Sequence, residues 1–331
     1  VIAVNKSAFR ALVKFTDEEI DFICRFVQDE ARKMGKEEIE ISEMHNIVEG
    51  ALERVNPKVA KSYRDYRNYK QDFVQMLDEV YKKSQSIMYI GDKENSNTDS
   101  ALVSTKRSLI FNQLNKELYK KFFLTTEELQ ACRDGYIYIH DMSARRDTMN
   151  CCLFDVQSVL QGGFEMGNLW YNEPKTLDVA FDVIGDIVLS AASQQYGGFT
   201  VPSADLILEP YAEKSYKYYI EKYKNIGLDE EKSKEIAIQD IQRDFEQGFQ
   251  GWEYKFNSVS SSRGDYPFIT VTIGTGTGRF AKMASKTMLE VRKNGQGKKG
   301  HKKPVLFPKV VFLYDEKLHG EGGPLEDVFE A

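Results

Sequence analysis

The spacing of apolar residues predicts that residues 1–90 are mostly helical. Between residues 20 and 27, apolar side chains recur every three or four positions, which is typical of one buried helix face. Thr16 and Glu19 have the spacing of a capping box just before this stripe. A second stripe follows Ser42, and we expect that serine to cap a second helix.

A break in this pattern predicts a domain boundary near residue 90. The stretch 91–100, GDKENSNTDS, is polar and has no periodicity, so we expect a linker or an extended crossing segment there. We therefore divide the chain into a helical domain at 1–90 and a larger domain at 91–331.

The larger domain contains both strand-like and helical patterns. Strict alternation with β-branched residues at 268–273 predicts a buried strand, and Tyr136–His140 is a shorter β-type run. Thr125 is placed to cap a helix that stops at Gly135. The other expected helices are 103–122, 174–196, 205–225, 229–251 and one that starts near Arg279.

Composition and charge narrow the class of protein. At 331 residues the chain is long enough for one large domain and a small one. The net charge of −6 argues against a nucleic-acid groove, and no apolar run approaches the roughly 18 residues of a membrane span. No signal peptide is visible, and the start at Val1 suggests that the first residues of a longer chain are missing. The cysteines at 24, 132, 151 and 152 show no disulfide framework, so we expect reduced thiols in the cytoplasm.

Chemically reactive side chains concentrate in one short stretch. It brings together His140, Asp141, Asn150 and the adjacent Cys151 and Cys152, in a chain with only 4 Cys and 4 His. Neighbouring side chains of an extended segment point to opposite faces, so the two thiols are not expected to line the same surface. No His/Cys cluster has the spacing of metal ligands, and no metal site is predicted.

Several motifs occur in a distinctive order in the second domain. They are N-x-N-x-D-S and T-K-R at 95–107, IHD at 139–141, NCCLFD at 150–155, GF-x-MGN at 163–168 and YGGFT at 196–200. In this order they resemble the anaerobic (class III) ribonucleoside-triphosphate reductases, a glycyl-radical enzyme family. The resemblance continues through YKFNSVSSSRGDYPFITVTIGTGTG and PVLFPKVVFLYD, so it covers about 95–315.

A second resemblance concerns the front of the chain. The segment at 41–67, ISEMHNIVEGALERVNPKVAKSYRDYR, resembles the C-terminal half of an ATP-cone, a small regulatory nucleotide-binding domain. The basic β-hairpin that opens such cones is absent, so normal binding of ATP or dATP by the residues present is not expected. Lys61 and Arg67 are the candidates for phosphate contacts, with a solvated helix face as the alternative.

The resemblance implies an α/β fold, namely part of a ten-stranded α/β barrel of the glycyl-radical enzyme type with its active site inside. A small helical, ATP-cone-like domain precedes it. In this family a radical stored on a backbone glycine passes to a cysteine on a central finger loop. Both groups are expected beyond Ala331, so we expect this chain to be inactive alone. The implied substrates are ribonucleoside triphosphates, with formate or a thiol as reductant, a homodimer as the assembly and a radical-SAM activating enzyme as partner.

Two other interpretations remain open. A non-catalytic nucleotide-sensing dimerisation module would retain the front of the barrel without radical chemistry. The other is a different glycyl-radical enzyme, such as one of the formate-lyase type. The cone-like front and the NCC and MGN motifs argue against that second alternative.

The resemblance assigns roles to three residues of the reactive stretch. Cys151 matches the cysteine whose thiol faces the ribose, which leaves Cys152 as a packing residue. Asn150 is expected either to hydrogen-bond a ribose hydroxyl or to cap a turn. His140 follows the family's H-D pattern, but Tyr138 stands where many members carry another histidine, so a purely structural histidine is the alternative.

The resemblance also implies control by ATP or dATP and by a dNTP specificity effector, bound with Mg at a helical dimer interface. By position, Lys175, Asn172 and Asp186 are expected near that effector. Asn172 stands where some relatives have Glu, so the readout of the base is expected to differ. A solvated lysine is the alternative for Lys175.

Two further segments are candidates for phosphate contacts. The glycine-rich GTGTG stretch around Gly276 precedes a helix, whose first backbone amides are suited to binding a phosphate. A structural turn is the alternative. The basic loop at 294–304 is either a solvated loop or a nucleotide-phosphate loop. In the second case, the residues that neutralise triphosphate charge are Lys298, Lys299 and Lys302.

Overall fold

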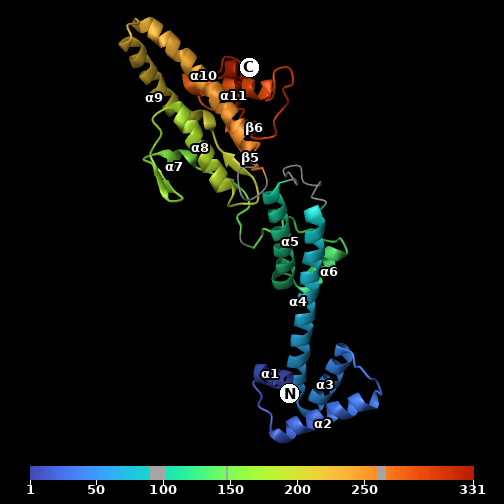
Figure 1. Ribbon diagram of the computed structural model, residues 1–331. Helices are drawn as coiled ribbons and strands as arrows, with labels where there is room; N and C mark the ends of the chain where they lie inside the picture. The colour runs from blue at the N-terminus through green and yellow to red at the C-terminus, as the bar shows by residue number, and fades with distance from the viewer. Residues whose placement is uncertain (90–101, 147, 259–265) are drawn as a thin grey trace. The chain divides into compact units, whose positions relative to one another are not determined.

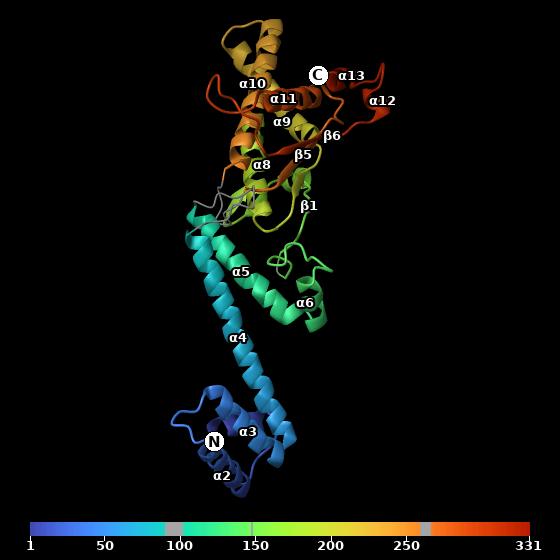
Figure 2. The ribbon, with the colours of Figure 1, turned by 90° about the vertical axis from the view of Figure 1, so that its right-hand side faces the viewer.

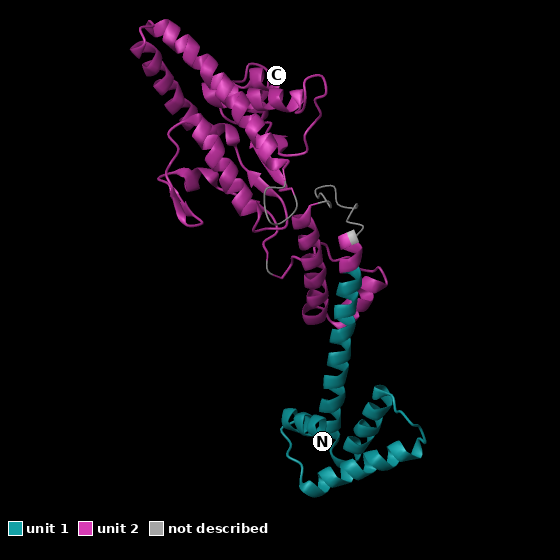
Figure 3. Cartoon of the chain, in the orientation of Figure 1, with its two compact units in different colours: residues 1–83 teal, residues 84–331 magenta. Residues whose placement is uncertain are grey.

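The computed structural model describes residues 1–331 except 90–101, 147 and 259–265 (Figure 1). The predicted linker at 91–100, the N-x-N-x-D-S motif and the SSSRGD stretch lie outside the described residues. The chain divides into two compact units, residues 1–83 and 84–331 (Figure 3).

The first unit is helical, as the apolar stripes predicted. It comprises α1 (Ile2–Arg10), α2 (Asp17–Lys33), α3 (Ile41–Val55) and the first part of α4 (Pro57–Tyr89). Their apolar faces form one core, whose buried members are Val4, Ala8, Ala11, Phe15, Ile23, Ala51, Leu52, Val59, Ala60 and Tyr63.

The helix starts in this unit confirm one predicted cap and correct another. Thr16 and Glu19 form the expected capping box of α2. Ser42 does not cap α3, because it already lies inside that helix. The N-cap is Glu40, two residues earlier, and the Glu43 carboxylate accepts a hydrogen bond from the Glu40 amide over 3.3 Å.

After the end of α4, the second unit continues with two helices. These are α5 (Val103–Phe123) and α6 (Thr126–Arg133), and Thr125 forms a capping box with Glu128 at the start of α6. The helix stops at Gly135, whose φ of 80° lies in the left-handed region that glycine tolerates best. Both features confirm the sequence predictions.

The predicted β-type run at Tyr136–His140 is wrong. The amides of Tyr136 and Ile137 both donate to the carbonyl of Ala131, so the start of this segment is bound to the end of α6. Tyr136 and Tyr138 are 83% and 86% exposed. A strand needs a neighbour to satisfy its backbone groups, and none of the described residues pairs with this run.

A four-stranded parallel sheet organises the rest of the unit. Its order is β1 (Cys152–Leu153), β4 (Phe199–Val201), β5 (Ile269–Ile273) and β6 (Lys309–Phe312), so neighbouring strands follow one another along the chain. The predicted strand at 268–273 is confirmed as β5, with Ile269, Val271 and Ile273 fully buried. Between β1 and β4 lies a hairpin of β2 (Phe164–Met166) and β3 (Leu169–Tyr171).

Helices connect and cover these parallel strands, and α8, α9, α10 and α11 pack against one another (Figures 1 and 2). An aromatic cluster joins α8 to α10: the Phe181 ring lies edge-on to Phe249 and Trp252, and the Trp252 indole donates to the Phe181 carbonyl over 2.9 Å. The predicted charged helix therefore also carries a buried face. The helices are α7 (Val156–Leu160), α8 (Leu177–Ala192), α9 (Ala204–Asn225), α10 (Glu230–Phe256), α11 (Arg279–Asn294), α12 (Glu316–His319) and α13 (Glu326–Phe329).

The predicted α/β class is therefore confirmed as a mixed α/β fold with a parallel sheet, preceded by a helical region. In the described part of the chain, no helix combines the length and the apolar character required to cross a bilayer.

Candidate active site and nucleotide-binding surfaces

The reactive cysteine pair lies where the chain enters β1 beside the segment that leads into β4. Backbone hydrogen bonds align the two segments: the Gly197 amide donates to the Asn150 carbonyl over 2.9 Å, and the Cys152 amide donates to the Gly198 carbonyl over 3.1 Å. This parallel pairing brings the NCC and YGG motifs, far apart in sequence, into direct contact.

The sulfur of Cys151 has two hydrogen-bond partners. It donates to Asn150 Oδ1 over 3.2 Å and accepts from the Gly198 backbone amide over 3.2 Å. The Cys151 side chain is exposed, whereas Cys152 is half-buried against the core of the unit. Burial raises the pKa of the Cys152 thiol, although a hydrogen bond with Gln195 opposes that change. Cys151 is therefore the thiol that a ligand can reach.

His140 lies in a separate local arrangement. Its ring Nδ1 pairs with the carboxylate of the adjacent Asp141, and its carbonyl accepts a long hydrogen bond of 3.4 Å from Arg145. Asp141 has a positive φ of 51°, so the chain turns sharply at this point. Among the described contacts, none joins His140 to Asn150 or Cys151.

The three residues expected near a specificity effector are not gathered within one chain. Asn172 and Lys175 are exposed in the segment before α8. Asp186 lies nine residues beyond the start of that helix, which is roughly 14 Å along its axis at the usual rise per residue. It faces Lys255 of α10, whose ammonium lies 4.0 Å from Asp186 Oδ1 and 2.9 Å from Asp182 Oδ1.

The glycine-rich loop after β5 already binds a carboxylate of this chain. Asp205, fully buried in the first turn of α9, accepts hydrogen bonds through Oδ2 from the backbone amides of Gly274, Thr275 and Gly276, at 3.1, 3.0 and 2.8 Å. This arrangement fits the alternative of a structural turn, because the Gly276 amide already donates to Asp205; a phosphate contact by this amide stays a prediction. The loop amides bind the Asp205 carboxylate of the same chain in the way that such turns bind an external anion.

The basic loop before β6 is anchored at its base. Gln296 and Lys303 pair through two backbone hydrogen bonds of 2.9 and 2.8 Å. The Gln296 side chain also donates to the buried carboxylate of Glu253 on α10 over 2.5 Å. Burial raises the pKa of Glu253, against the lowering effects of Gln296 and Arg292. The predicted phosphate-contact residues on this loop, all exposed, are Lys298, Lys299 and Lys302.

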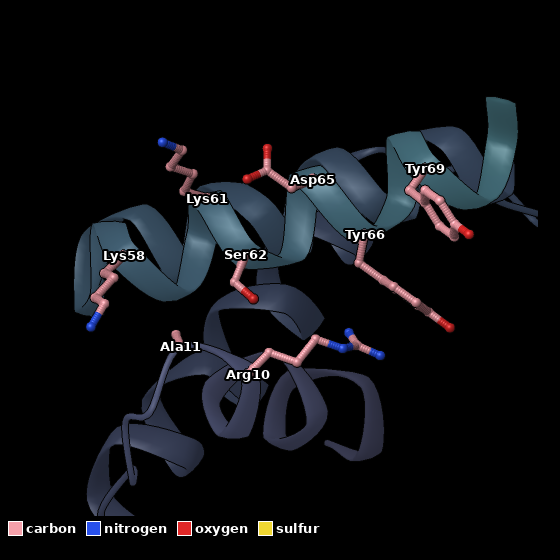
Figure 4. Close-up of a pocket in the computed structure, with 8 residues that line it drawn as sticks. All are labelled: Arg10, Ala11, Lys58, Lys61, Ser62, Asp65, Tyr66 and Tyr69. Atoms are coloured by element: carbon pink, nitrogen blue, oxygen red, sulfur yellow. The ribbon is translucent and has the colours of Figure 1, made fainter. Parts of the chain in front are cut away.

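The helical unit contains a shallow cavity of about 390 Å³ between α1 and α4 (Figure 4). The Arg10 guanidinium lies 3.6 Å from the centre of the Tyr66 ring, which places a cation on an aromatic face at its edge. Lys61, one predicted phosphate contact, lines this cavity. The full lining is Arg10, Ala11, Lys58, Lys61, Ser62, Asp65, Tyr66 and Tyr69.

Arg67, the other predicted contact, lies outside this cavity and pairs with α3. Its guanidinium donates to Asn46 over 3.1 Å and lies 3.3 Å from the Glu49 carboxylate. It also lowers the pKa of the nearby His45, although burial of the imidazole is the larger cause. The structure therefore does not bring Lys61 and Arg67 together.

The sequence did not point to Arg10 or His45. His45 Nδ1 lies 2.7 Å from the Tyr63 hydroxyl, so the two side chains form a polar pair between α3 and α4. No local spacing rule links residues on separate helices. Among the described residues, no group of three or more His, Cys, Asp and Glu side chains is arranged to hold a metal ion.

Curated relatives share sequence with this chain along most of its length. The anaerobic ribonucleoside-triphosphate reductase of Haemophilus influenzae is 29% identical in an alignment of 340 positions, gaps included, that covers 98% of this chain and 46% of that protein. The enzyme of the same description from Enterobacteria phage T4 is 33% identical over 68% of this chain and 37% of its own length. The chain thus spans about half the length, or less, of these relatives.

Solved structures also align with the chain. The crystal structure of the anaerobic ribonucleotide reductase from Thermotoga maritima in complex with dATP and CTP has a TM-score of 0.46 at 14% identity, over 68% of this chain and 43% of that one.

Family comparison confirms both resemblances. Residues 2–72 match the ATP cone domain, a longer stretch than the segment at 41–67 that carried the resemblance. Residues 94–331 match the family described as anaerobic ribonucleoside-triphosphate reductase. Because this second match includes the cysteine pair, the parallel sheet and the helices around it, the chain belongs to the anaerobic ribonucleoside-triphosphate reductase family.

Proposed function

We propose that this protein takes part in the anaerobic reduction of ribonucleoside triphosphates to deoxyribonucleotides, with the Cys151 thiol facing the substrate ribose. The observation that carries the proposal is the exposed sulfur at the start of β1, inside the region that matches the family. Asn150 accepts from this sulfur through its side-chain oxygen, which leaves its amide nitrogen to donate to a ribose hydroxyl.

The chemistry needs a group that the described residues do not contain. A glycyl radical, expected from the family, would supply the power to abstract hydrogen from the ribose. The residues of this chain would orient the sugar, exclude alternative thiols from it and hold the Cys151 hydrogen beside it. Formate or a thiol donor would provide the reducing equivalents, and a radical-SAM enzyme would activate the protein.

Substitution of the two adjacent cysteines tests the catalytic proposal. In the intact, activated protein, Cys151→Ser should reduce deoxyribonucleotide formation to background, because an alcohol does not replace a thiol in hydrogen transfer. Cys152→Ser is the matched control and should retain most of the activity, since its side chain packs against the core. Full activity of Cys151→Ser would contradict the role of this thiol, whereas no activity of the unsubstituted intact protein after activation would favour a nucleotide-sensing module without catalysis.

Nucleotide control is the second part of the proposal. We propose that the ATP cone binds ATP or dATP in the full-length protein, and that a dNTP effector binds between two copies of the chain. The separation of Lys175 from Asp186 within one chain supports the need for a second copy, because a two-fold axis can bring the start of α8 in one copy close to the middle of α8 in the other. The reductant and the activating enzyme rest on the family alone.

Binding measurements separate the effector proposal from the catalytic one. Calorimetry with each dNTP should show affinities that depend on the base. Light scattering on the same samples should show that the dNTP that binds most tightly also promotes dimerisation. Lys175→Ala should weaken that binding several-fold and leave unfolding unchanged, because the lysine is exposed. Equal affinity for all dNTPs, or no effect of Lys175→Ala, would contradict the assignment.

A further inference from the structure

Two consecutive glycines before β4 hold the sulfur of Cys151 from a distant part of the sequence. The Gly198 amide donates to Sγ over 3.2 Å, while Sγ donates to Asn150 Oδ1 over 3.2 Å. The Gly197 amide donates to the Asn150 carbonyl over 2.9 Å, which fixes the backbone on the other side of the sulfur. The thiol therefore lies between one donor and one acceptor whose positions are set by the parallel pairing of the segments.

Gly197 leaves no space for a side chain beside this thiol. A Cβ at this position would lie 2.2 Å from Asn150 Oδ1 and 2.5 Å from Cys151 Sγ. Gly197 is not among the glycines with a positive φ, so its backbone is one that alanine can adopt. Glycine is thus needed at this position for close approach and not for its backbone freedom.

Gly198 provides a matched contrast. A Cβ there would meet only the Phe268 carbonyl oxygen, at an ordinary contact distance of 3.8 Å. Its contribution to the sulfur comes from the backbone amide, which an alanine would retain. The two neighbouring glycines therefore differ in what a methyl group would disturb.

We propose that Gly197 and the backbone amide of Gly198 are positioning elements for the Cys151 thiol: Gly197 allows the sulfur to approach the backbone, and the Gly198 amide directs a hydrogen bond at it. Their part in the reaction rests on the proposed function of Cys151. An N–H donor stabilises the sulfur anion, whereas the Asn150 oxygen stabilises the S–H form. The two contacts therefore act in opposite directions on the same atom.

The rate of alkylation at Cys151 tests this arrangement without requiring turnover. The intact protein is treated with iodoacetamide over a range of neutral to alkaline pH, and modification of each cysteine is followed by mass spectrometry. Gly197→Ala should displace the sulfur from the Gly198 amide and slow alkylation of Cys151 about 3- to 10-fold near neutral pH. Asn150→Ala should instead speed alkylation of Cys151, because the side-chain oxygen that accepts the S–H hydrogen bond is lost.

The controls distinguish positioning from general damage. In the Gly198→Ala variant, the rate of alkylation at Cys151 should stay within about twofold of the rate in the unsubstituted protein, since the amide donor remains. Cys152 in the same samples should keep its low reactivity. A Gly197→Ala protein that folds and reacts at the original rate would overturn the proposal, as would an equal effect of Gly198→Ala.

Two further outcomes keep the test decisive. If Gly197→Ala does not fold, Asn150→Ala carries the test, and an unchanged or slower rate there overturns the proposal. The catalytic proposal is judged separately by the activity of Cys151→Ser. Unaltered alkylation of Gly197→Ala together with an inactive Cys151→Ser would remove this inference and leave the proposed function standing.

Discussion

Asp205 Oδ2 lies 2.8 Å from the backbone nitrogen of Gly276, across a long separation in sequence. The carboxylate joins the first turn of α9 to the loop that leads from β5 into α11. The other oxygen, Oδ1, is buried without a hydrogen-bond partner among the described residues. An internal anion thus shapes the glycine-rich loop, which explains why that loop resembles a phosphate-binding turn in sequence.

Asp205→Asn should lower the free energy of unfolding by about 2–3 kcal/mol, because charge-assisted hydrogen bonds become neutral ones and an amide N–H is left buried. Chemical denaturation of the intact protein measures the change. Asp182→Asn, at a carboxylate whose side chain is 77% exposed, is the control and should change stability by less than about 1 kcal/mol. Equal effects of the two substitutions would mean that the loop does not depend on Asp205.

A matched pair of glycines on α10 tests the packing of that helix on α8. A Cβ at Gly248 would lie 2.2 to 2.5 Å from atoms of the Phe181 ring, so Gly248→Ala should destabilise the protein by about 1–3 kcal/mol. A Cβ at Gly251 would meet nothing within 4 Å, so Gly251→Ala should stabilise it by about 0.5–1 kcal/mol through higher helix propensity. Thermal unfolding of both variants should therefore move in opposite directions, and a shift of the same sign would contradict the packing.

The pH dependence of the helical unit should follow His45. Burial, with the charges of Arg67 and Lys70, lowers the pKa of this histidine below its ordinary value of 6.5. As the pH falls below 6.5, the unfolded chain takes up the proton first, so the stability conferred by the neutral imidazole is lost until the folded form is also protonated. His45→Gln should flatten this part of the pH–stability curve.

Arg67→Ala provides a direct measurement of the same interaction. Removal of this positive charge should raise the pKa of His45 towards 6.5 without reaching it, since burial is the larger cause. NMR titration of the histidine rings reports the change, with His301 in the second unit as an internal reference. A His45 titration that does not respond to Arg67→Ala would show that the two side chains do not interact in solution.

The basic loop should contribute to triphosphate affinity through charge. Single substitutions Lys298→Ala, Lys299→Ala and Lys302→Ala should each weaken nucleoside triphosphate binding about 2- to 5-fold, and less at high salt, because each removes one exposed positive charge. Lys293→Ala, at the exposed end of α11 outside the loop, is the control and should leave the affinity unchanged. Calorimetric titration measures the affinity. An equal loss of affinity in Lys293→Ala would show that the loop lysines act only through the general surface charge of the protein.

Local features were predictable because their partners lie within a few residues. The capping boxes at Thr16 and Thr125 join positions three residues apart, and the alternation at 268–273 follows directly from the two faces of a strand. Motif order was enough to indicate the family. The run at Tyr136–His140 failed because a strand also requires a neighbour, which no local pattern specifies.

The sequence by itself determined where most of the helices begin, which strand is buried and which short stretch holds the reactive thiols. Only the tertiary structure decided which partner each polar group meets. Cys151 meets the Gly198 amide, and Asp205 meets the loop amides, because parallel strands bring distant segments into register. Each of these pairings depends on backbone hydrogen bonds between segments far apart in the chain, so spacing along the sequence contains no direct signal for it.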